Sequence, residues 1–339
     1  MNRNSKKTIV SVIVFAALLA LTLYVLFKGG NPGDLFKAMK NAHYGYLIAG
    51  FLFASMFIFC EGLNIHRGIQ LLGYHKSIGE TIRYAIVGFF FSSITPGASG
   101  GQPMQVYYMH KENIKISHSA LALILEVLSF QIAETIGFVL GILLMHSYIN
   151  SALGSFRLFI YLALAGKAIV ISILLIVIFS KGMTYKLKTI SMKIVRLFSK
   201  KNTEALEEKF DNEIVKYQSG ASVIRRNKNS IIKMVGTSFV QVVCLYLVTF
   251  FVCRSFSLAD YSWMEIAGLQ AIVNVVASFV PLPGSIGANE GIFAVIFGGI
   301  IPAAMVSNTI LVTRGLSLYL LMIICGIIIF VDVKRRRLI

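Results

Sequence analysis

Long apolar stretches separated by short polar segments account for most of the chain. A helix needs about 20 apolar residues to cross the hydrocarbon core of a bilayer. Six of the stretches are long enough, and each is predicted to form a transmembrane helix. They are Thr8–Phe27, Tyr46–Asn64, Ala120–His146, Leu158–Ser180, Ile231–Arg254 and Thr309–Val331.

Two runs rich in glycine and proline, Thr95–Pro103 and Pro281–Gly291, interrupt the apolar pattern. Irregular backbone persists at membrane depth only where protein covers it or where it lines a water-filled cavity. We therefore predict two re-entrant helical hairpins, near residues 85–108 and 266–305, beside a transport pathway. The apolar segments that flank the runs are short: Ala85–Ile94, Ile266–Val280 and Ile292–Met305.

Composition supports an integral membrane protein. Hydrophobic residues make up 56% of the 339 residues and charged residues 14%, and the mean hydropathy is +0.76. A soluble domain has a lower apolar and a higher charged fraction. We expect an all-α polytopic membrane protein with about six full spans and two opposed re-entrant hairpins. The four cysteines lie in apolar segments without paired spacing, so neither a zinc site nor a disulfide framework is expected.

The distribution of lysine and arginine predicts the topology, because cytoplasmic loops retain positive charge. Most of the 32 basic residues fall on one side when both termini are cytoplasmic. The two hairpins then open to opposite sides of the membrane. The halves 1–180 and 231–339 are either an inverted repeat, as in many secondary transporters, or two unrelated kinked regions.

The segment 181–230 between these halves is polar and basic. Basic and apolar residues alternate over residues 188–201, which predicts an amphipathic helix on the cytoplasmic membrane surface, in contact with anionic lipid headgroups. A second helix is predicted for Thr203–Tyr217, with Thr203 as its N-cap. About 50 residues are too few for an ordinary catalytic domain. No soluble domain is available to bind nucleic acid.

Charged side chains at membrane depth are costly, so each is a candidate functional residue. Glu126 and Glu134 share one predicted helix with Gln131. They either line the transport route or pair with Lys167 in a structural network. Arg314, at the start of the last predicted span, either serves the site or extends to the outer interface. The charged residues singled out at membrane depth are Glu126, Glu134, Lys167, Glu290 and Arg314.

The two glycine and proline runs can present backbone N–H groups in a concave array. If each run leads into a short helix, the positive helix ends favour a phosphate or a carboxylate. Lys167 or Arg314 could offset a phosphate charge. The other interpretation is that the glycines only permit close packing. The predicted substrate-binding residues are Gly100, Gly101, Gln102, Pro103, Gln105, Pro281, Pro283, Gly284, Gly287, Asn289, Glu290 and Arg314.

At these two runs the chain resembles a known family. The patterns Thr-Pro-Gly-x-x-Gly-Gly-Gln-Pro-x-Gln at Thr95–Gln105 and Pro-x-Pro-Gly-x-x-Gly-x-x-Glu-Gly at Pro281–Gly291 are similar to those of the lysylphosphatidylglycerol synthase transmembrane (flippase) family of bacteria. The resemblance covers nearly the whole chain. It implies a lipid translocator of the cell membrane that moves aminoacylated phosphatidylglycerol outward and contributes to antimicrobial peptide resistance.

In fused members of that family a soluble C-terminal domain synthesises the lipid. This chain ends directly after its last span, which implies a stand-alone member that is a transporter and not an enzyme. Many members have an acid where Gln102 stands and an arginine where Gln105 and Val127 stand, so the resemblance implies no charge pair at those positions. The family positions that match are Pro96, Gly101, Pro103, Pro281, Pro283, Gly284, Gly287, Glu290 and Arg314.

The sequence thus predicts a protein that translocates a phospholipid such as phosphatidylglycerol or its aminoacylated form. Glu290 and Arg314 would form a gate or a charge pair. No nucleotide-binding loop of the Gly-x-x-x-x-Gly-Lys-Ser/Thr type is present, so an ion gradient or the lipid gradient must supply the energy. Proton coupling through Glu290 is one hypothesis. No cofactor or metal is expected, and the expected partners are the lipid, a separate lipid synthase and a second copy of the chain.

Three other functions stay open at this point. The chain could be an accessory subunit of a lipid aminoacyltransferase, or a transporter of ions or small solutes. A membrane-embedded transferase would need an acid–base group near the headgroup plane. The candidates for that group are His66, His75, His110 and His118.

Overall fold

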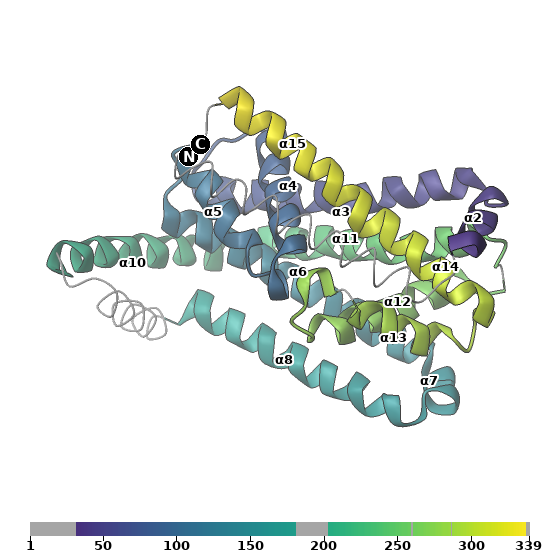
Figure 1. The fold of residues 1–339 in the computed structure, drawn as a ribbon. Coiled ribbons are helices and arrows are strands. Elements are labelled where there is room, and N and C mark those ends of the chain that lie inside the picture. The colour runs from purple at the N-terminus through teal and green to yellow at the C-terminus, as the bar shows by residue number, and fades with distance from the viewer. Residues whose placement is uncertain (1–31, 181–202, 259, 286, 337–339) are drawn as a thin grey trace.

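The computed structural model describes residues 32–180 and 203–336, apart from residues 259 and 286. All regular elements in these ranges are helices (Figure 1). The expected first span, Thr8–Phe27, and the expected amphipathic helix at 188–201 lie outside the described residues. The described part begins with a short helix, α2 (Pro32–Lys40).

Five described helices are long and apolar enough to cross a membrane. Four are α3 (Tyr44–Leu71), α6 (Ile116–Leu144), α8 (Arg157–Phe179) and α11 (Lys228–Ser255). The fifth runs over Ala303–Asp332. It consists of α14 (Ala303–Arg314), a π-helical turn η4 (Gly315–Tyr319) and the first part of α15 (Leu320–Arg336). The chain is therefore a multi-pass membrane protein, and its described part is all-helical.

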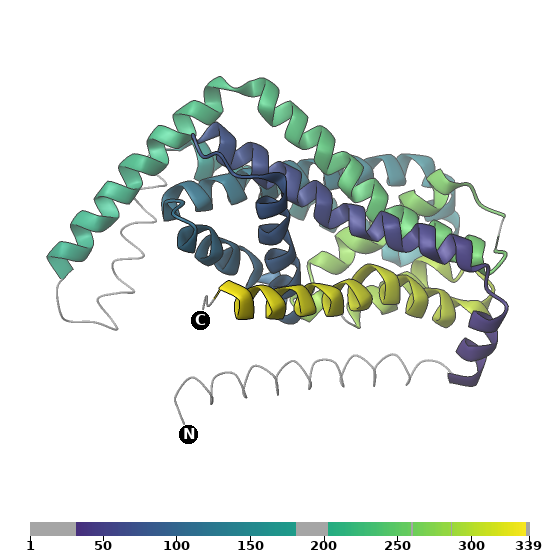
Figure 2. The same cartoon turned by 90° about the horizontal axis from the view of Figure 1, so that it is seen from above.

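Helices α3 and α11 form the centre of the bundle as an antiparallel pair. At one end the His43 N–H donates to the Ser255 carbonyl at 2.9 Å. At the other end the Asn64 amide donates to the Ser238 hydroxyl at 2.8 Å. Both helices contain 28 residues, and Figure 2 shows them side by side. Helix α6 packs against α3, α11 and α12, so the pair is covered over much of its length.

Each glycine and proline run joins two short helices. The first run joins α4 (Ile78–Ile94) to α5 (Gly101–Lys111) through a 3-10 turn, η1 (Pro96–Ala98). The second joins α12 (Trp263–Ser278) to α13 (Ala288–Phe297) through η3 (Pro283–Ser285). All four helices are shorter than the 20 or so residues that a full span requires.

Helices α4 and α12 begin in the same way. In both, an N-cap serine accepts from the backbone N–H of a glutamate three residues later, whose carboxylate accepts from the serine N–H. The pairs are Ser77 with Glu80 and Ser262 with Glu265. Such a capping box satisfies two backbone donors that the first helical turn leaves free. It explains why α4 begins at Ile78, seven residues before the apolar segment from which it was predicted.

The region 292–305 differs from the expected single segment. Helix α13 ends at Phe297, and a turn over residues 298–302 separates it from α14. Gly298, Gly299 and Pro302 occupy this turn, and proline disfavours a helical conformation at the preceding residue. The last span consequently begins at Ala303 instead of Thr309. Arg314 therefore lies inside this helix, not at its start as predicted.

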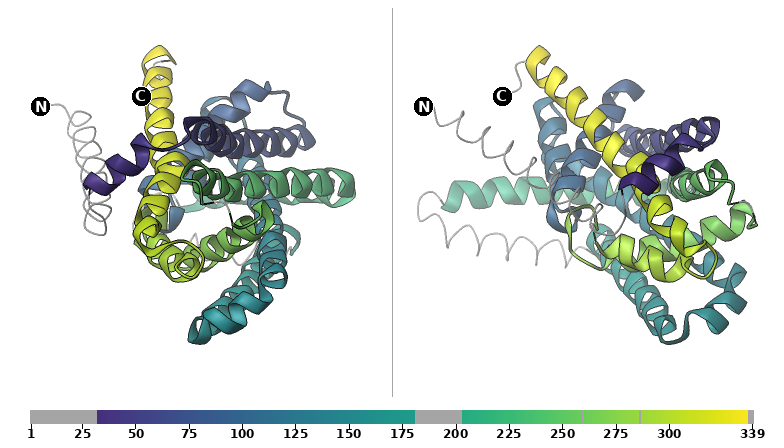
Figure 3. Two further views of the ribbon diagram at one scale, coloured as in Figure 1. Left: turned by 90° about the vertical axis from the view of Figure 1, so that its right-hand side faces the viewer. Right: turned by 45° about the vertical axis from the view of Figure 1, so that its right-hand side comes forward.

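The remaining described elements lie at the periphery. After α6 the chain passes through α7 (His146–Ala152) and η2 (Gly154–Phe156) into α8. Helix α8 leans away from the bundle (Figure 3), and it is the least buried of the five spans. Helix α10 (Thr203–Arg226) is longer than predicted from Thr203–Tyr217, and it packs against α6 through buried residues such as Ile224.

Candidate functional site

The two glycine and proline turns lie against each other near the middle of the bundle. Turns η1 and η3 are in contact, and a Cβ atom placed on Gly97 would lie 3.9 Å from the Pro281 Cβ atom. The turns share an unusual backbone. Gly97 and Ala98 have φ of 59° and 56°, and Gly284 and Ser285 have φ of 55° and 51°. Two consecutive residues with positive φ are rare outside glycine, so the runs form the same turn twice.

Glycine at position 101 allows α5 to pack closely on α4. A Cβ atom there would lie 2.8 Å from the carbonyl oxygen of Gly88. The Gln105 side chain occupies the space above Gly88, where any larger residue would displace it. Close packing thus explains why glycine occupies positions 88 and 101. For Gly101 this is the interpretation in which the glycines of the runs permit close packing.

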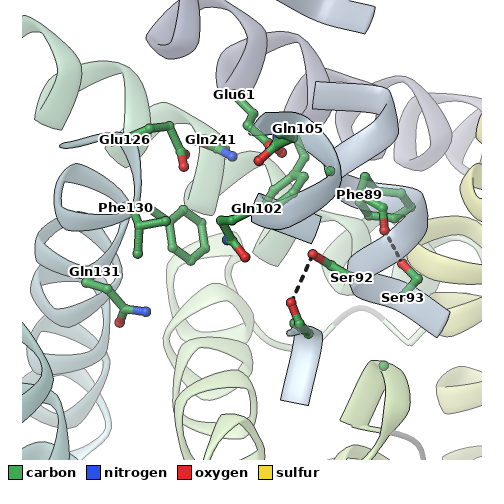
Figure 4. Close-up of a pocket in the computed structure, with 15 residues that line it drawn as sticks. Glu61, Phe89, Ser92, Ser93, Gln102, Gln105, Glu126, Phe130, Gln131 and Gln241 are labelled. Carbon is green, nitrogen blue, oxygen red and sulfur yellow. Dashed lines mark hydrogen bonds between the residues drawn. The ribbon is translucent and has the colours of Figure 1, made fainter. Parts of the chain in front are cut away.

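A cavity of about 340 Å³ lies where the two turns meet helices α3, α4, α5, α6 and α11. Its walls are partly aromatic and partly polar, and Figure 4 shows Gln102, Gln131, Gln241 and Glu126 directed into it. No lysine, arginine or histidine is among the described residues that line it. The lining residues are Phe57, Glu61, Gly88, Phe89, Ser92, Ser93, Ala98, Gln102, Gln105, Glu126, Val127, Phe130, Gln131, Gln241 and Gly284.

Gln105 ties the first hairpin to helix α3. Its side chain is only 2% exposed. Its amide nitrogen donates to the Glu61 carboxylate at 2.8 Å and to the Tyr84 carbonyl at 3.1 Å. Both amide hydrogens are therefore engaged, which fixes the position of Glu61 in the cavity wall.

Glu126 projects from α6 into the same cavity. It is 7% exposed, and none of the described residues donates a hydrogen bond to it or forms an ion pair with it. Gln241 of α11 is 1% exposed, and its amide oxygen has no hydrogen-bond partner in the part of the chain that the structure describes. The cavity thus contains several acceptors that lack donors.

Glu134, Gln131 and Lys167 form a separate group between α6 and α8. Lys167 is paired with Glu134, and its ammonium group also donates to the Gln131 amide oxygen at 2.7 Å. Both charged side chains are buried. This is the structural network considered from the sequence, but Glu126 is not part of it. Lys167 is already neutralised by Glu134.

Glu290 and Arg314 form an ion pair between α13 and α14. The Arg314 Nε atom donates to Glu290 Oε1 at 3.1 Å, and the guanidinium also donates to the Gly284 carbonyl. The other carboxylate oxygen of Glu290 accepts from the Gly287 N–H at 2.6 Å. A π-helical turn follows Arg314 directly, and such turns are frequent at functional sites. Arg314 therefore fixes the second turn beside the cavity.

Asn289 lies in a chain of buried polar side chains and does not line the cavity. Its amide donates to the Asn274 oxygen at 3.4 Å, and that oxygen also accepts from Gln270 at 2.8 Å. The Thr249 hydroxyl in turn donates to the Gln270 oxygen at 2.9 Å. This chain connects α11, α12 and α13.

The structure thus divides the predicted site residues into two groups. Gln102, Gln105, Glu126, Gln131 and Gly284 line the cavity. The others support the turns or belong to the neighbouring ion pairs and polar chain: Gly100, Gly101, Pro103, Pro281, Pro283, Gly287, Asn289, Glu290, Arg314, Glu134 and Lys167. None of the four candidate histidines of a transferase is among the cavity residues.

Sequence reasoning missed Glu61, Ser92, Ser93 and Gln241. Glu61 was concealed because its span was expected to end at Asn64, which placed the carboxylate near a helix end. Helix α3 continues to Leu71, so Glu61 lies well inside it. The available signal was that the seven residues after Asn64, Ile65–Leu71, contain no proline that would end the helix.

At another edge of the molecule, charged side chains connect α4, α5 and α15. Arg83 lies 3.8 Å from Glu112 and 3.5 Å from Asp332, and Lys76 pairs with Glu80 and Glu112. The backbone N–H of Ser77 lowers the pKa of Glu80 to about 2, with burial opposing and the Ser77 hydroxyl and Lys76 assisting. These contacts hold the first hairpin to the last helix.

Comparison with known proteins gives consistent matches. The sequence model of the lysylphosphatidylglycerol synthase TM region matches residues 8–325. A UPF0104 membrane protein of Archaeoglobus fulgidus is 26% identical over 291 residues, which cover 82% of this chain and 84% of that protein. A UPF0104 membrane protein of Methanothermobacter thermautotrophicus is 21% identical over 319 residues, 92% of each chain.

Proposed function

Because the chain belongs to the lysylphosphatidylglycerol synthase TM region family, we propose that it is a membrane lipid translocator. Its substrate would be a phospholipid such as phosphatidylglycerol or its aminoacylated form. The observation that carries the proposal is the polar cavity at the contact between two glycine and proline turns. Transporters place their substrate sites where helices are broken near the bilayer midplane.

The proposal includes an inverted repeat, in which α3, α4, η1 and α5 correspond to α11, α12, η3 and α13. Four observations support this correspondence: the equal length of α3 and α11, the capping boxes of α4 and α12, the turns with matching φ, and the short helices that follow. The antiparallel contact of α3 with α11 is what a two-fold axis in the membrane plane requires. Each pair of short helices would then be a re-entrant hairpin.

With both termini in the cytoplasm, as the basic loops predict, the two hairpins open to opposite sides. The headgroup would reach the cavity from one side and leave it toward the other, while the acyl chains stay in the bilayer. Gln102 is exposed and lies in the cavity wall, where it can contact an entering headgroup.

Arg314 is the cation best placed to meet a phosphate. It already donates to the carbonyl of Gly284, a residue of the cavity wall. A phosphate that enters near Gly284 would compete with Glu290 for the planar guanidinium, which binds both carboxylate and phosphate groups in a bidentate manner. If phosphate replaced the Glu290 carboxylate as the partner of Arg314, the second turn would be released. This release would act as a gate.

The test is a headgroup-accessibility assay in proteoliposomes with fluorescent phosphatidylglycerol, lysylphosphatidylglycerol and phosphatidylcholine. We expect faster exposure of one lipid with the wild type, and loss of this rate in Glu290→Gln and Arg314→Ala. The control is Glu265→Gln, which changes a carboxylate to an amide at the start of α12, away from the cavity. Rates equal to those of empty vesicles for every lipid would contradict the proposal.

The family description names a synthase, which favours an accessory subunit of a lipid aminoacyltransferase as the second candidate. Such a subunit would change the amount of aminoacylated lipid made by a separate enzyme but not its distribution between leaflets. Measuring both quantities in the same vesicles separates the two functions. A transporter of ions or small solutes would instead give flux into sealed vesicles that does not depend on the lipid headgroup.

A further inference from the structure

Glu290, which the sequence suggested as a proton carrier, is not free to serve as one. One of its carboxylate oxygens accepts from Arg314 and the other accepts from the N–H of Gly287. Both oxygens are therefore occupied by donors that belong to the structure of the second turn. Protonation would break contacts that hold the second turn in place. A coupling proton therefore needs a different site.

The cavity offers two carboxylates from different helices, Glu61 of α3 and Glu126 of α6. Glu61 accepts one hydrogen bond, from Gln105. Glu126 has no donor among the described residues. The cavity wall, as far as the structure describes it, holds no basic side chain to balance two negative charges. Two carboxylates that share one site do not both ionise readily.

Gln241 gives a second, independent indication that a donor is missing. Its side chain is 1% exposed and lines the cavity, yet its amide oxygen has no partner in the described part of the chain. A buried acceptor without a donor costs about 1–3 kcal/mol. A proton on a neighbouring carboxyl group supplies a donor to a cavity that is rich in acceptors.

Charged groups on the surrounding helices have other partners. Arg67 donates to Asn64 and Thr237, Lys167 pairs with Glu134, and Arg314 pairs with Glu290. The arginines and the lysine each have a partner, so none is available to neutralise Glu126.

We propose that Glu61 and Glu126 form one proton-binding site, which holds a single proton between the two carboxylates. The proton comes from the water that reaches the cavity past Gln102. Coupling of this proton to lipid movement rests on the proposed function. Binding of the proton itself does not. When a headgroup enters the cavity, it displaces the proton or requires it, so the transport rate depends on the pH gradient.

Infrared difference spectroscopy of the purified full chain tests proton binding without any lipid transport. The wild type should show the C=O stretch of a protonated carboxyl group, which disappears over about two pH units as the single proton is released. The band should be lost in Glu126→Gln and shifted or lost in Glu61→Gln. Glu265→Gln is the matched control and should keep it. Circular dichroism shows whether each variant retains its helices.

A wild type without a protonated carboxyl band at any pH, or a band that survives in both cavity variants, would overturn the proton site. Coupling to transport is tested in the proteoliposomes of the headgroup-accessibility assay. The pH is varied at constant Na⁺, and Na⁺ is varied at constant pH. A pH-dependent wild-type rate and a pH-independent Glu126→Gln rate are expected. A rate that follows Na⁺ and not pH would overturn the coupling. If no lipid moves while the band titrates, the proposed function fails and the proton site stands.

Discussion

Arg314 donates to Glu290 across the gap between the last span and the second hairpin, with 3.1 Å between Nε and Oε1. The side chains are 13% and 14% exposed, so water screens the pair little. Because the same guanidinium donates to the Gly284 carbonyl, a single residue joins α13, α14 and the second turn. The pair thus connects the wall of the cavity to a helix that crosses the membrane.

Removal of one partner of this pair should destabilise the protein more than removal of both. Arg314→Gln leaves a carboxylate with no cation, and breaking a buried pair costs about 3–5 kcal/mol. In the double variant Glu290→Gln with Arg314→Gln no uncompensated charge remains. We expect its loss in melting temperature, measured in detergent, to be smaller than the loss in Arg314→Gln alone. Additive losses would show that the two residues act independently.

The pair Lys167 and Glu134 allows a parallel test away from the turns. Lys167→Met leaves Glu134 buried between α6 and α8 without its cation, and should lower the melting temperature strongly. Adding Glu134→Gln should restore most of that loss, because the amide needs no counter-charge. Lipid transport of the rescued double variant should remain close to that of the wild type, since neither residue lines the cavity. A double variant as unstable as Lys167→Met would contradict this account.

Gly101→Ala should separate α5 from α4. The new Cβ atom would lie 2.8 Å from the Gly88 carbonyl oxygen, a distance that forces the backbone to move. Overpacking of this kind costs about 1–3 kcal/mol. Gly291→Ala is the control, because no atom beyond its chain neighbours and its own helix backbone lies within 4 Å of its Cβ position and the residue is helical. Thermal unfolding of both variants should show a loss only for position 101. An unchanged Gly101→Ala protein would mean that the first hairpin tolerates expansion.

The capping box of α4 should make stability depend on acid. The pKa of Glu80 falls from 4.5 to about 2 in the folded protein, chiefly through the Ser77 N–H. A lowered pKa adds stability that is fully present above pH 4.5 and is lost as the pH falls toward 2. Glu80→Gln keeps a capping side chain but removes this titration. The difference in melting temperature between wild type and variant should therefore shrink as the pH falls through this range. A constant difference would refute a stabilising role for the ionised Glu80.

Hydrophobic patterning predicted the described long spans well. The segments Tyr46–Asn64, Ala120–His146, Leu158–Ser180 and Ile231–Arg254 fall within or nearly within helices of the structure, because burial in hydrocarbon selects long apolar runs whatever their neighbours are. Boundaries were less accurate where polar groups decide them. The capping box at Ser77 extended α4, and the turn at Gly298–Pro302 divided a segment that was expected to be continuous.

The sequence alone identified an all-helical membrane protein, its family resemblance and the two glycine and proline runs, because chain length, apolarity and local backbone restrictions are properties of neighbouring residues. Only the tertiary structure decided which distant residues share a cavity. It paired Glu290 with Arg314 and Glu134 with Lys167, and it brought Glu61 beside Gln105 while leaving Glu126 without a donor. These outcomes depend on how antiparallel helices face each other, and a difference of one residue in helix phase turns a side chain by about 100°.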